Sequence, residues 1–267
     1  MSQPAGRSVL ADFVAALAGG SVKCVDLTNT LSPDFPVIVL PPEFGACAPF
    51  RMEQVSRYDA NGPAWYWNAI SMNEHTGTHF DAPAHWVTGR DLPSNTVDAV
   101  PPADFLAPAV VIDITREAAA DADFVLTRDF LEDWEQANGP IPPRHWIALR
   151  TDWYRKVGTP DYLNMQEDGA HSPGPDAGAM DFLVHERDCV GLAVETVGTD
   201  AGQASHFNPP FPAHSILHGN GRYGLQCLRN LDRLPTFGAI IVACPLKIEG
   251  GSGSPLRVVA IIEEGAA

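Results

Sequence analysis

The feature that most constrains the fold is a series of short apolar runs spread along the whole chain. Each run has the length of a buried strand, and turn residues separate it from the next. Segments with helical spacing of apolar residues lie between the runs, without strict alternation of strand and helix. The sequence therefore predicts an α/β fold with a mixed, largely antiparallel sheet. The runs expected to be core strands are 110–114, 146–150, 190–194, 239–244 and 256–262.

The length of 267 residues is enough for one large domain with a sizeable core. The spacing of apolar residues predicts a helix over 7–18, stopped by two glycines, and another over 126–134, capped by Thr127. Residues 32–64 are rich in proline and glycine, and we expect them to form a long connection that lines or covers a site. No segment has the composition of a linker, so we expect one domain spanning residues 1–267.

The charge balance excludes some classes of partner. The 17 lysine and arginine residues against 33 aspartate and glutamate residues give a net charge of −16, which would repel nucleic acid phosphates. No stretch of about 18 uncharged apolar residues could span a membrane, and the start of the chain lacks a secretion signal. Five widely spaced cysteines without a Cys-x-x-Cys pair indicate free thiols. We therefore expect a cytoplasmic protein that binds neither nucleic acid nor membranes.

A histidine-rich segment carries the strongest chemical signal. Three histidines and one aspartate lie within eleven residues: His75, His79, Asp81 and His85. Their odd numbers would place them on one face of an extended backbone, where Gly77 would leave room for an ion. Two neutral imidazoles and one carboxylate leave coordination positions open and suit Mn²⁺, Zn²⁺ or Fe²⁺. An isolated histidine is usually structural, but four ligand-type side chains on one face favour a metal site.

The same segment resembles a family signature. From His75 to His85 the sequence reads His-Thr-Gly-Thr-His-Phe-Asp-Ala-Pro-Ala-His, which is similar to the signature His-x-Gly-Thr-His-x-Asp-x-Pro-x-His of cyclase-like metal-dependent hydrolases. This family includes bacterial kynurenine formamidase and isatin hydrolase, and the blocks 26–28, 197–200 and 245–255 also resemble it. The resemblance implies a swivelling β/β/α domain with the cyclase-like fold, and a homodimer or higher homo-oligomer.

The resemblance also implies roles for the residues of the segment. His75, His79 and Asp81 match the ligands of the metal, and His85 matches the histidine that shuttles protons. On this basis a metal-activated water would attack the scissile carbonyl carbon. His85 would act first as the general base and then as the general acid that protonates the leaving nitrogen.

A departure from the family pattern lies far downstream. In the formamidases a later histidine and a glutamate twelve residues on complete a second zinc site; here His214 matches the histidine, but Gln226 replaces the glutamate. A neutral amide is a poorer ligand than a carboxylate, so a second divalent cation would be under-compensated. We expect one tightly bound metal, with His214 and Gln226 contacting the substrate. The glutamine resembles the isatin hydrolase branch, which favours Mn²⁺ over Zn²⁺; a weak second metal at Gln226 is the alternative.

The predicted substrate follows from this branch of the family. We expect hydrolysis of a cyclic amide, isatin to isatinate, in a pocket for a small aromatic lactam. A flat ring requires aromatic side chains around it, and Trp86, Trp65 and Phe35 are candidates, although each could equally pack in the core. His206 is assigned to the pocket because it lies close in the chain to His214.

Two other functions stay open at this point. An arylformamidase acting on N-formylkynurenine would share the fold and the metal, but Gln226 weighs against it. A non-catalytic metal-binding or small-molecule-binding protein on the same fold is the second, and an intact His85 weighs against it. A serine or cysteine hydrolase does not fit, because the chain has no Gly-x-Ser-x-Gly elbow and no cysteine with a family signature.

Overall fold

The computed structural model describes residues 8–40 and 46–265. Its α-helices are α1 (Val9–Gly19), α2 (Thr115–Ala120), α3 (Arg128–Asn138), α4 (Ala177–Asp181) and α5 (Pro212–Gly219). Its strands are β1 (Val22–Asp26), β2 (Arg51–Asp59), β3 (Gly62–Ser71), β4 (His79–Asp81), β5 (Leu106–Asp113), β6 (Val125–Leu126), β7 (Trp146–Arg150), β8 (Met165–Gln166), β9 (Gly169–Ala170), β10 (Gly174–Pro175), β11 (Gly191–Val194), β12 (Tyr223–Gln226), β13 (Phe237–Ala243), β14 (Gly253–Pro255) and β15 (Val258–Glu263).

One large sheet organises the molecule. Among the described residues, nine strands pair in the order β1-β15-β13-β5-β7-β11-β12-β4-β14. The central strands β5, β7, β11 and β12 run parallel to one another. The other pairs in the sheet are antiparallel. The prediction of an α/β fold with a mixed, largely antiparallel sheet is therefore confirmed.

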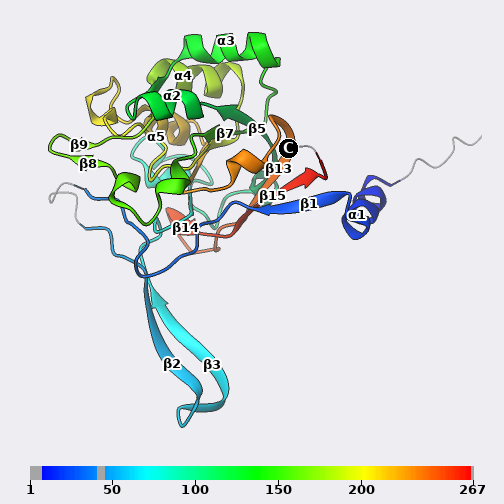
Figure 1. Ribbon diagram of the computed structural model, residues 1–267, viewed down its shortest axis with the longest axis vertical. Helices are drawn as coiled ribbons and strands as arrows, with labels where there is room; N and C mark the ends of the chain where they lie inside the picture. The colour runs from blue at the N-terminus through cyan, green and yellow to red at the C-terminus, as the bar shows by residue number, and fades with distance from the viewer. Residues whose placement is uncertain (1–7, 41–45, 266–267) are drawn as a thin grey trace, which may run out of the picture.

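Both faces of the central sheet are buried, which explains why its strands consist of continuous apolar runs. Side chains alternate along a strand, so Trp146 and Ala148 of β7 pack on one face while Ile147 and Leu149 pack on the other. Helices α3, α4 and α5 cover the second face (Figure 1). The apolar runs that the sequence assigned to core strands correspond to β5, β7, β11, β13 and β15.

Two helices lie where the sequence predicted them, with the expected residues at their ends. Helix α3 begins at Arg128 because the Thr127 hydroxyl accepts a hydrogen bond from the backbone N–H of Phe130 at 3.3 Å. Helix α1 ends at Gly19, and Gly20 follows with φ of 77°, the left-handed conformation that closes many helices. Residue 7, the first of the predicted helix, lies outside the described residues.

Strands β2 and β3 form a hairpin that projects from the rest of the molecule (Figure 1). The prediction that 32–64 is a connection is wrong for Arg51–Asp59, which forms β2, and for 62–64, where β3 begins. Most side chains of β2 are exposed on both faces, so its sequence lacks the apolar–polar alternation that burial of one face imposes. Residues 41–45 of the predicted connection lie outside the described residues.

Two further features concern the cysteine residues and the length and apolar character of the helices. All five cysteines are free thiols, as the sequence predicted. Cys189 and Cys227 are buried, while Cys24 and Cys244 are exposed. In the described part of the chain, no helix has both the length and the apolar character needed to cross a bilayer.

Candidate metal centre

Strand β4 positions two residues of the histidine-rich segment. It pairs with β12 on one edge and with β14 on the other, antiparallel to both. His79 and Asp81 lie two residues apart and share one face, while Phe80 between them is fully buried in the core. Hydrogen bonds on both edges thus hold a very short strand in place, and with it the two polar side chains.

The rest of the segment is not extended, so the prediction of one shared strand face is wrong for His75 and His85. His75 lies in the turn before β4, and His85 ends the short turn Pro83–His85 after it. Gly77 has φ of 70°, a left-handed conformation that glycine adopts without strain. Its role is therefore the turn rather than room for an ion, and its carbonyl oxygen accepts a hydrogen bond from Nδ1 of His79 at 2.8 Å.

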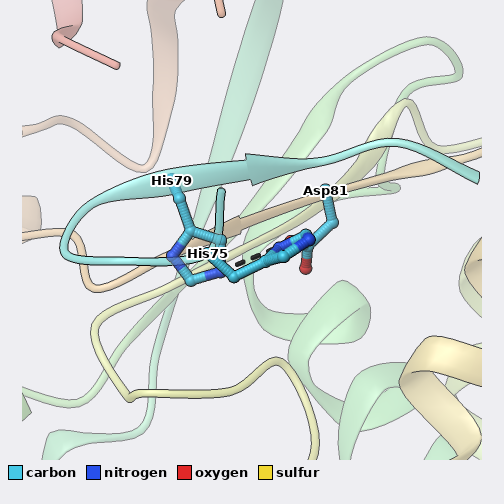
Figure 2. Close-up of side chains that lie close together, drawn as sticks. All are labelled: His75, His79 and Asp81. Carbon is cyan, nitrogen blue, oxygen red and sulfur yellow. Dashed lines mark hydrogen bonds and ion pairs between the residues drawn. The ribbon is translucent and has the colours of Figure 1, made fainter. Parts of the chain in front are cut away.

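Three ligand-type side chains nevertheless converge. Figure 2 shows His75, His79 and Asp81 directed toward one another. Oδ1 of Asp81 lies 2.7 Å from Nδ1 of His75 and 3.3 Å from Nε2 of His79. One atom of each side chain lies within 4.8 Å of the other two. We call these three residues the ligand group, because two nitrogens and one carboxylate oxygen match the donor set of a divalent transition metal.

Each of the two imidazoles forms a hydrogen bond through the ring nitrogen that points away from Asp81. The other ring nitrogen is thereby oriented toward Asp81, where a cation would bind. Nδ1 of His79 donates to a backbone carbonyl, so Nε2 is the nitrogen that faces Asp81, and a bound cation would take the place of its proton. Nε2 of His75 lies 3.0 Å from the Ser252 hydroxyl, which donates to Oε2 of Glu74 at 2.7 Å. Nε2 of His75 therefore donates to the Ser252 hydroxyl, and Nδ1 is the nitrogen that faces Asp81 and would bind a cation.

The charge of Asp81 also fits a cation. Its side chain has no exposed surface, and within residues 8–40 and 46–265 no lysine or arginine pairs with it. Burial acts to raise the pKa of Asp81, but the neighbouring histidines hold that pKa well below its usual value. Burial acts to lower the pKa of His79, yet the Asp81 charge raises the pKa of His79 to about 10. A buried carboxylate whose only positive partners are imidazoles is a site where a divalent cation fits.

His85 lies beside the ligand group. Its ring stacks on that of His75, with centroids 3.8 Å apart. Burial lowers the pKa of His85 to about 3, although the charge of Asp81 opposes that shift. The ring is therefore neutral at physiological pH, so one of its two nitrogens has an available lone pair.

Helix α5 and strand β12 bring the two downstream residues to Asp81. Nε2 of His214, in the first turn of α5, lies 4.0 Å from Oδ2 of Asp81. Burial acts to lower the pKa of His214, but a contact of 2.5 Å between its Nδ1 and Oδ2 of Asp200 raises that pKa. The amide of Gln226 contacts Oδ2 of Asp81. The structure thus brings both His214 and Gln226 to the ligand group.

His218 is a neighbour that the sequence analysis did not assign to the site. Its ring lies 5.5 Å from that of His214 and 6.0 Å from that of His85, measured between centroids. Nδ1 donates to the Arg222 carbonyl at 3.1 Å, and buried Nε2 has no partner in the described part of the chain. With atoms of Asp81 and His214 it forms a second set that could hold a cation. The signal was its position four residues after His214, which places both on one face of α5.

Two aromatic side chains flank the site. The ring of Trp86 lies 4.8 Å from that of His214, and Phe211 packs edge-on against Trp86 at 5.6 Å. The indole N–H of Trp86 donates to the Ser215 hydroxyl at 3.2 Å, which fixes the orientation of the ring. The structure therefore places Trp86 next to His85 and His214 and adds Phe211, which the sequence analysis missed.

The other three pocket candidates have different surroundings. Phe35 is buried against Tyr162, with ring centroids 6.2 Å apart, in an apolar cluster that includes Cys227. Trp65 is 51% exposed on β3 of the projecting hairpin. His206 is exposed at the end of a short turn that begins at Ala204. Their assignment to the substrate pocket stays a prediction.

Known proteins are similar to this chain in sequence and in structure. The isatin hydrolase of Roseibium aggregatum is 44% identical over 258 residues, which are 96% of this chain and 98% of that protein. The solved structure of isatin hydrolase A from Ralstonia solanacearum is 54% identical, superposes with a TM-score of 0.95, and matches 98% of this chain and 100% of that one. The kynurenine formamidase of Salinibacter ruber is 28% identical over 205 residues, 72% of this chain and 77% of that protein. The Cyclase family model matches residues 25–201. The chain therefore belongs to the Cyclase family and has the cyclase-like fold that its signature predicted.

Proposed function

We propose that the protein is a metal-dependent hydrolase of a cyclic amide, with isatin as substrate and isatinate as product. The observation that carries the proposal is the ring of His85, stacked on His75 beside a group that fits a divalent cation. A base next to a cation site is the arrangement that activates water for attack on a carbonyl carbon. Higher identity to isatin hydrolase than to kynurenine formamidase supports a lactam over an N-formyl amide.

The residues of the chain supply binding and proton transfer. A divalent cation bound at His75, His79 and Asp81 supplies Lewis-acid polarisation of the scissile carbonyl and lowers the pKa of water. His85 takes a proton from the water molecule as the water oxygen bonds to the lactam carbonyl carbon. His85 then gives that proton to the ring nitrogen as the carbon–nitrogen bond breaks. The opened lactam carries an amine and a carboxylic acid, and the acid releases the second proton of the water to the solvent to become the carboxylate.

We further propose one tightly bound metal, Mn²⁺, with Zn²⁺ as the alternative. Gln226 adds no negative charge beside Asp81, so a second divalent cation would share a single carboxylate with the first. The neutral amide is free instead to donate a hydrogen bond to an oxygen of the substrate as negative charge develops there. His214, whose Nε2 faces the same region, is the second proposed substrate contact.

The surface of the hairpin supports the proposal of a homodimer or higher homo-oligomer. Trp65, Trp67 and Ile70 of β3 are all more than half exposed on a hairpin that projects from the molecule (Figure 1). Large apolar side chains exposed on a hairpin, here with Trp65 and Trp67 on one face of β3, favour burial against a second copy of the chain. We also propose that residues 1–267 act as one domain in the cytoplasm, where the five free thiols stay reduced.

The proposal is tested on the purified protein with isatin and N-formylkynurenine as parallel substrates, together with elemental analysis. We expect faster turnover of isatin, complete loss of turnover after chelation, and recovery with Mn²⁺. Faster turnover of N-formylkynurenine would favour the arylformamidase. A bound metal without turnover of either substrate would favour a binding protein on the same fold.

A further inference from the structure

A strap of chain, residues 164–174, lies against the loop that begins at Asp200. The strap carries β8 and β9 and ends in β10. The N–H of Gly202 donates to the carbonyl oxygen of Ser172 at 2.9 Å. A Cβ on Gly202 would lie 2.3 Å from the carbonyl oxygen of Ala170, so only a glycine fits against the strap. The strap and the loop are therefore in direct backbone contact.

His171 connects the strap to two carboxylates. Its Nδ1 lies 2.7 Å from Oδ2 of Asp123, in the turn between α2 and β6. Its Nε2 lies 2.9 Å from Oδ1 of Asp168, in the turn between β8 and β9. The backbone of His171 also forms two hydrogen bonds with Asn164 at the start of the strap, with lengths of 3.1 and 2.9 Å. The ring is thus held between two turns that are distant in the sequence.

Both ring nitrogens face acceptors, so both must carry a proton for the two hydrogen bonds to exist. Carboxylate oxygens only accept hydrogen bonds, and a neutral imidazole has a single N–H. The geometry is therefore that of an imidazolium between two carboxylates. The hydrogen bonds to Asp123 and Asp168 raise the pKa of His171 above its usual value of 6.5. Of the other described neighbours, the Gln203 amide is uncharged and 3.4 Å from Nε2, and His206 acts on Asp168 through its charge.

The loop under the strap holds His214. Oδ1 of Asp200 accepts a hydrogen bond from the N–H of Ala213 at 2.6 Å, and Oδ2 accepts one from the N–H of His214 at 3.2 Å. The same Oδ2 lies 2.5 Å from Nδ1 of His214. These contacts fix the start of α5 and the orientation of the ring whose Nε2 faces Asp81. A displacement of the loop would therefore reach the ligand group.

We propose that His171 is a positioning residue, whose protonated ring is a clamp that ties the strap to the turn at Asp123 and thereby keeps the strap against the Asp200 loop that holds His214 at the site. The effect on turnover rests on the proposed function, whereas the clamp itself does not. Because the folded chain binds this proton more tightly than the unfolded chain, the clamp is closed below the raised pKa of His171. It opens as the pH rises through that pKa, since one carboxylate then faces a nitrogen that has no proton.

The clamp is tested by hydrogen exchange on the full chain loaded with Mn²⁺. Protection factors, corrected for the intrinsic pH dependence of exchange, are measured across a pH range that brackets the titration of the His171 ring, followed by NMR. We expect protection of 164–174 and of 200–203 to fall together, at the midpoint of that titration. The alkaline limb of kcat for isatin should share this midpoint. Protection that stays constant through the titration would overturn the proposal.

A matched pair of variants separates the clamp from general destabilisation. Asp168→Asn removes one of the two carboxylates and should lower the midpoint by about one pH unit. The control Asp181→Asn removes the carboxylate from another histidine pair on the surface, in which His185 lies 3.7 Å from Asp181, and should leave the midpoint unchanged. Asp123→Asn removes the other carboxylate and should act as Asp168→Asn does. Equal midpoints for Asp168→Asn, Asp123→Asn and the unchanged protein would overturn the proposal.

The two readouts also separate this inference from the proposed function. If protection of the strap follows the titration but isatin is not hydrolysed, the clamp stands and the proposed function fails. If isatin is hydrolysed while the hydrogen-exchange protection of the strap stays constant through the titration of His171, the proposed function stands and the clamp is wrong.

Discussion

The imidazole rings of His75 and His85 stack with their centroids 3.8 Å apart and their planes inclined by 30°. One ring belongs to the ligand group and the other is the proposed base. They come from the two turns that flank β4, and the pairing of that strand on both edges fixes their separation. A proton acceptor thus lies directly beside the place where a cation fits, without being needed to hold the cation.

Replacement of His85 should separate chemistry from metal binding. We expect His85→Ala to lower kcat for isatin about 100- to 10,000-fold, because it removes the general base and acid. Elemental analysis should find the metal content of the unchanged protein, since His75, His79 and Asp81 are intact. The control is His145→Ala, which alters an exposed ring that contacts the Pro143 carbonyl. Loss of metal together with activity would show that His85 is a ligand rather than a base.

A charge added at Gln226 should create a second metal site. In Gln226→Glu a carboxylate would face Oδ2 of Asp81 and lie near His214, and its charge would compensate a second divalent cation. Elemental analysis should give two metals per chain for the variant and one for the unchanged protein. Gln136→Glu, on the exposed face of α3, is the control for added charge. Two metals in the unchanged protein would refute the one-metal proposal and point to His218 as the additional ligand.

Buried Glu195 should make stability depend on pH. Oε2 accepts hydrogen bonds from the N–H and the hydroxyl of Thr151, while Oε1 has no partner among the described residues. Burial raises the pKa of Glu195 from 4.5 to about 7. Between these two values the unfolded chain releases the proton and the folded chain keeps it. The free energy of unfolding should therefore fall by up to about 3 kcal/mol as the pH rises from 4.5 to 7.

The variant Glu195→Gln cannot ionise, so it should lack this part of the pH dependence. Urea unfolding at a series of pH values, on metal-free protein so that metal loss at low pH does not contribute, measures the difference from the unchanged protein. The difference should change between pH 4.5 and 7 and be constant above. A difference that is constant throughout would mean that the native chain ionises this carboxyl as readily as the unfolded chain does.

The hairpin should decide the oligomeric state. Trp65 and Trp67 are 51% and 56% exposed and share one face of β3, because they are two residues apart. The double variant Trp65→Ser, Trp67→Ser should sediment as a monomer at concentrations where the unchanged protein is a homo-oligomer. Glu53→Gln on β2 is the control for a change on the same hairpin. An unchanged sedimentation coefficient in the double variant would place the interface elsewhere.

The fold class could be predicted because burial of a strand on both faces requires a continuous run of apolar residues. The central strands are covered on both faces, so β7 reads Trp-Ile-Ala-Leu-Arg with four buried side chains in succession. Strand β2 has no such run, because most of its side chains are exposed. An exposed strand is specified by pairing with its neighbour, and that pairing depends on context more than on the identity of single residues.

The candidate site was predicted in its centre and missed at its margins. Four of the residues are close in the sequence, and their spacing alone indicates a site: His75, His79, Asp81 and His85. Phe211 reaches the site through the direction of α5, which no local pattern specifies, whereas the spacing of His218 from His214 was a local signal that was not used. The partner of His75, Ser252, is 177 residues away in the chain, and only the completed sheet brings the two together.

The pairing of β4 with β14 has a consequence for biosynthesis. The segment that flanks His75 comes from the end of the sequence: Ser252 supplies the hydroxyl for its ring, and a Cβ on Gly253 would lie 2.4 Å from its Cε1. The ribosome must therefore translate beyond residue 253 before β4 gains its outer neighbour and His75 is locked in place. A nascent chain that stops short of β14 would expose an unfinished ligand group, so metal loading has to wait until β14 has been synthesised.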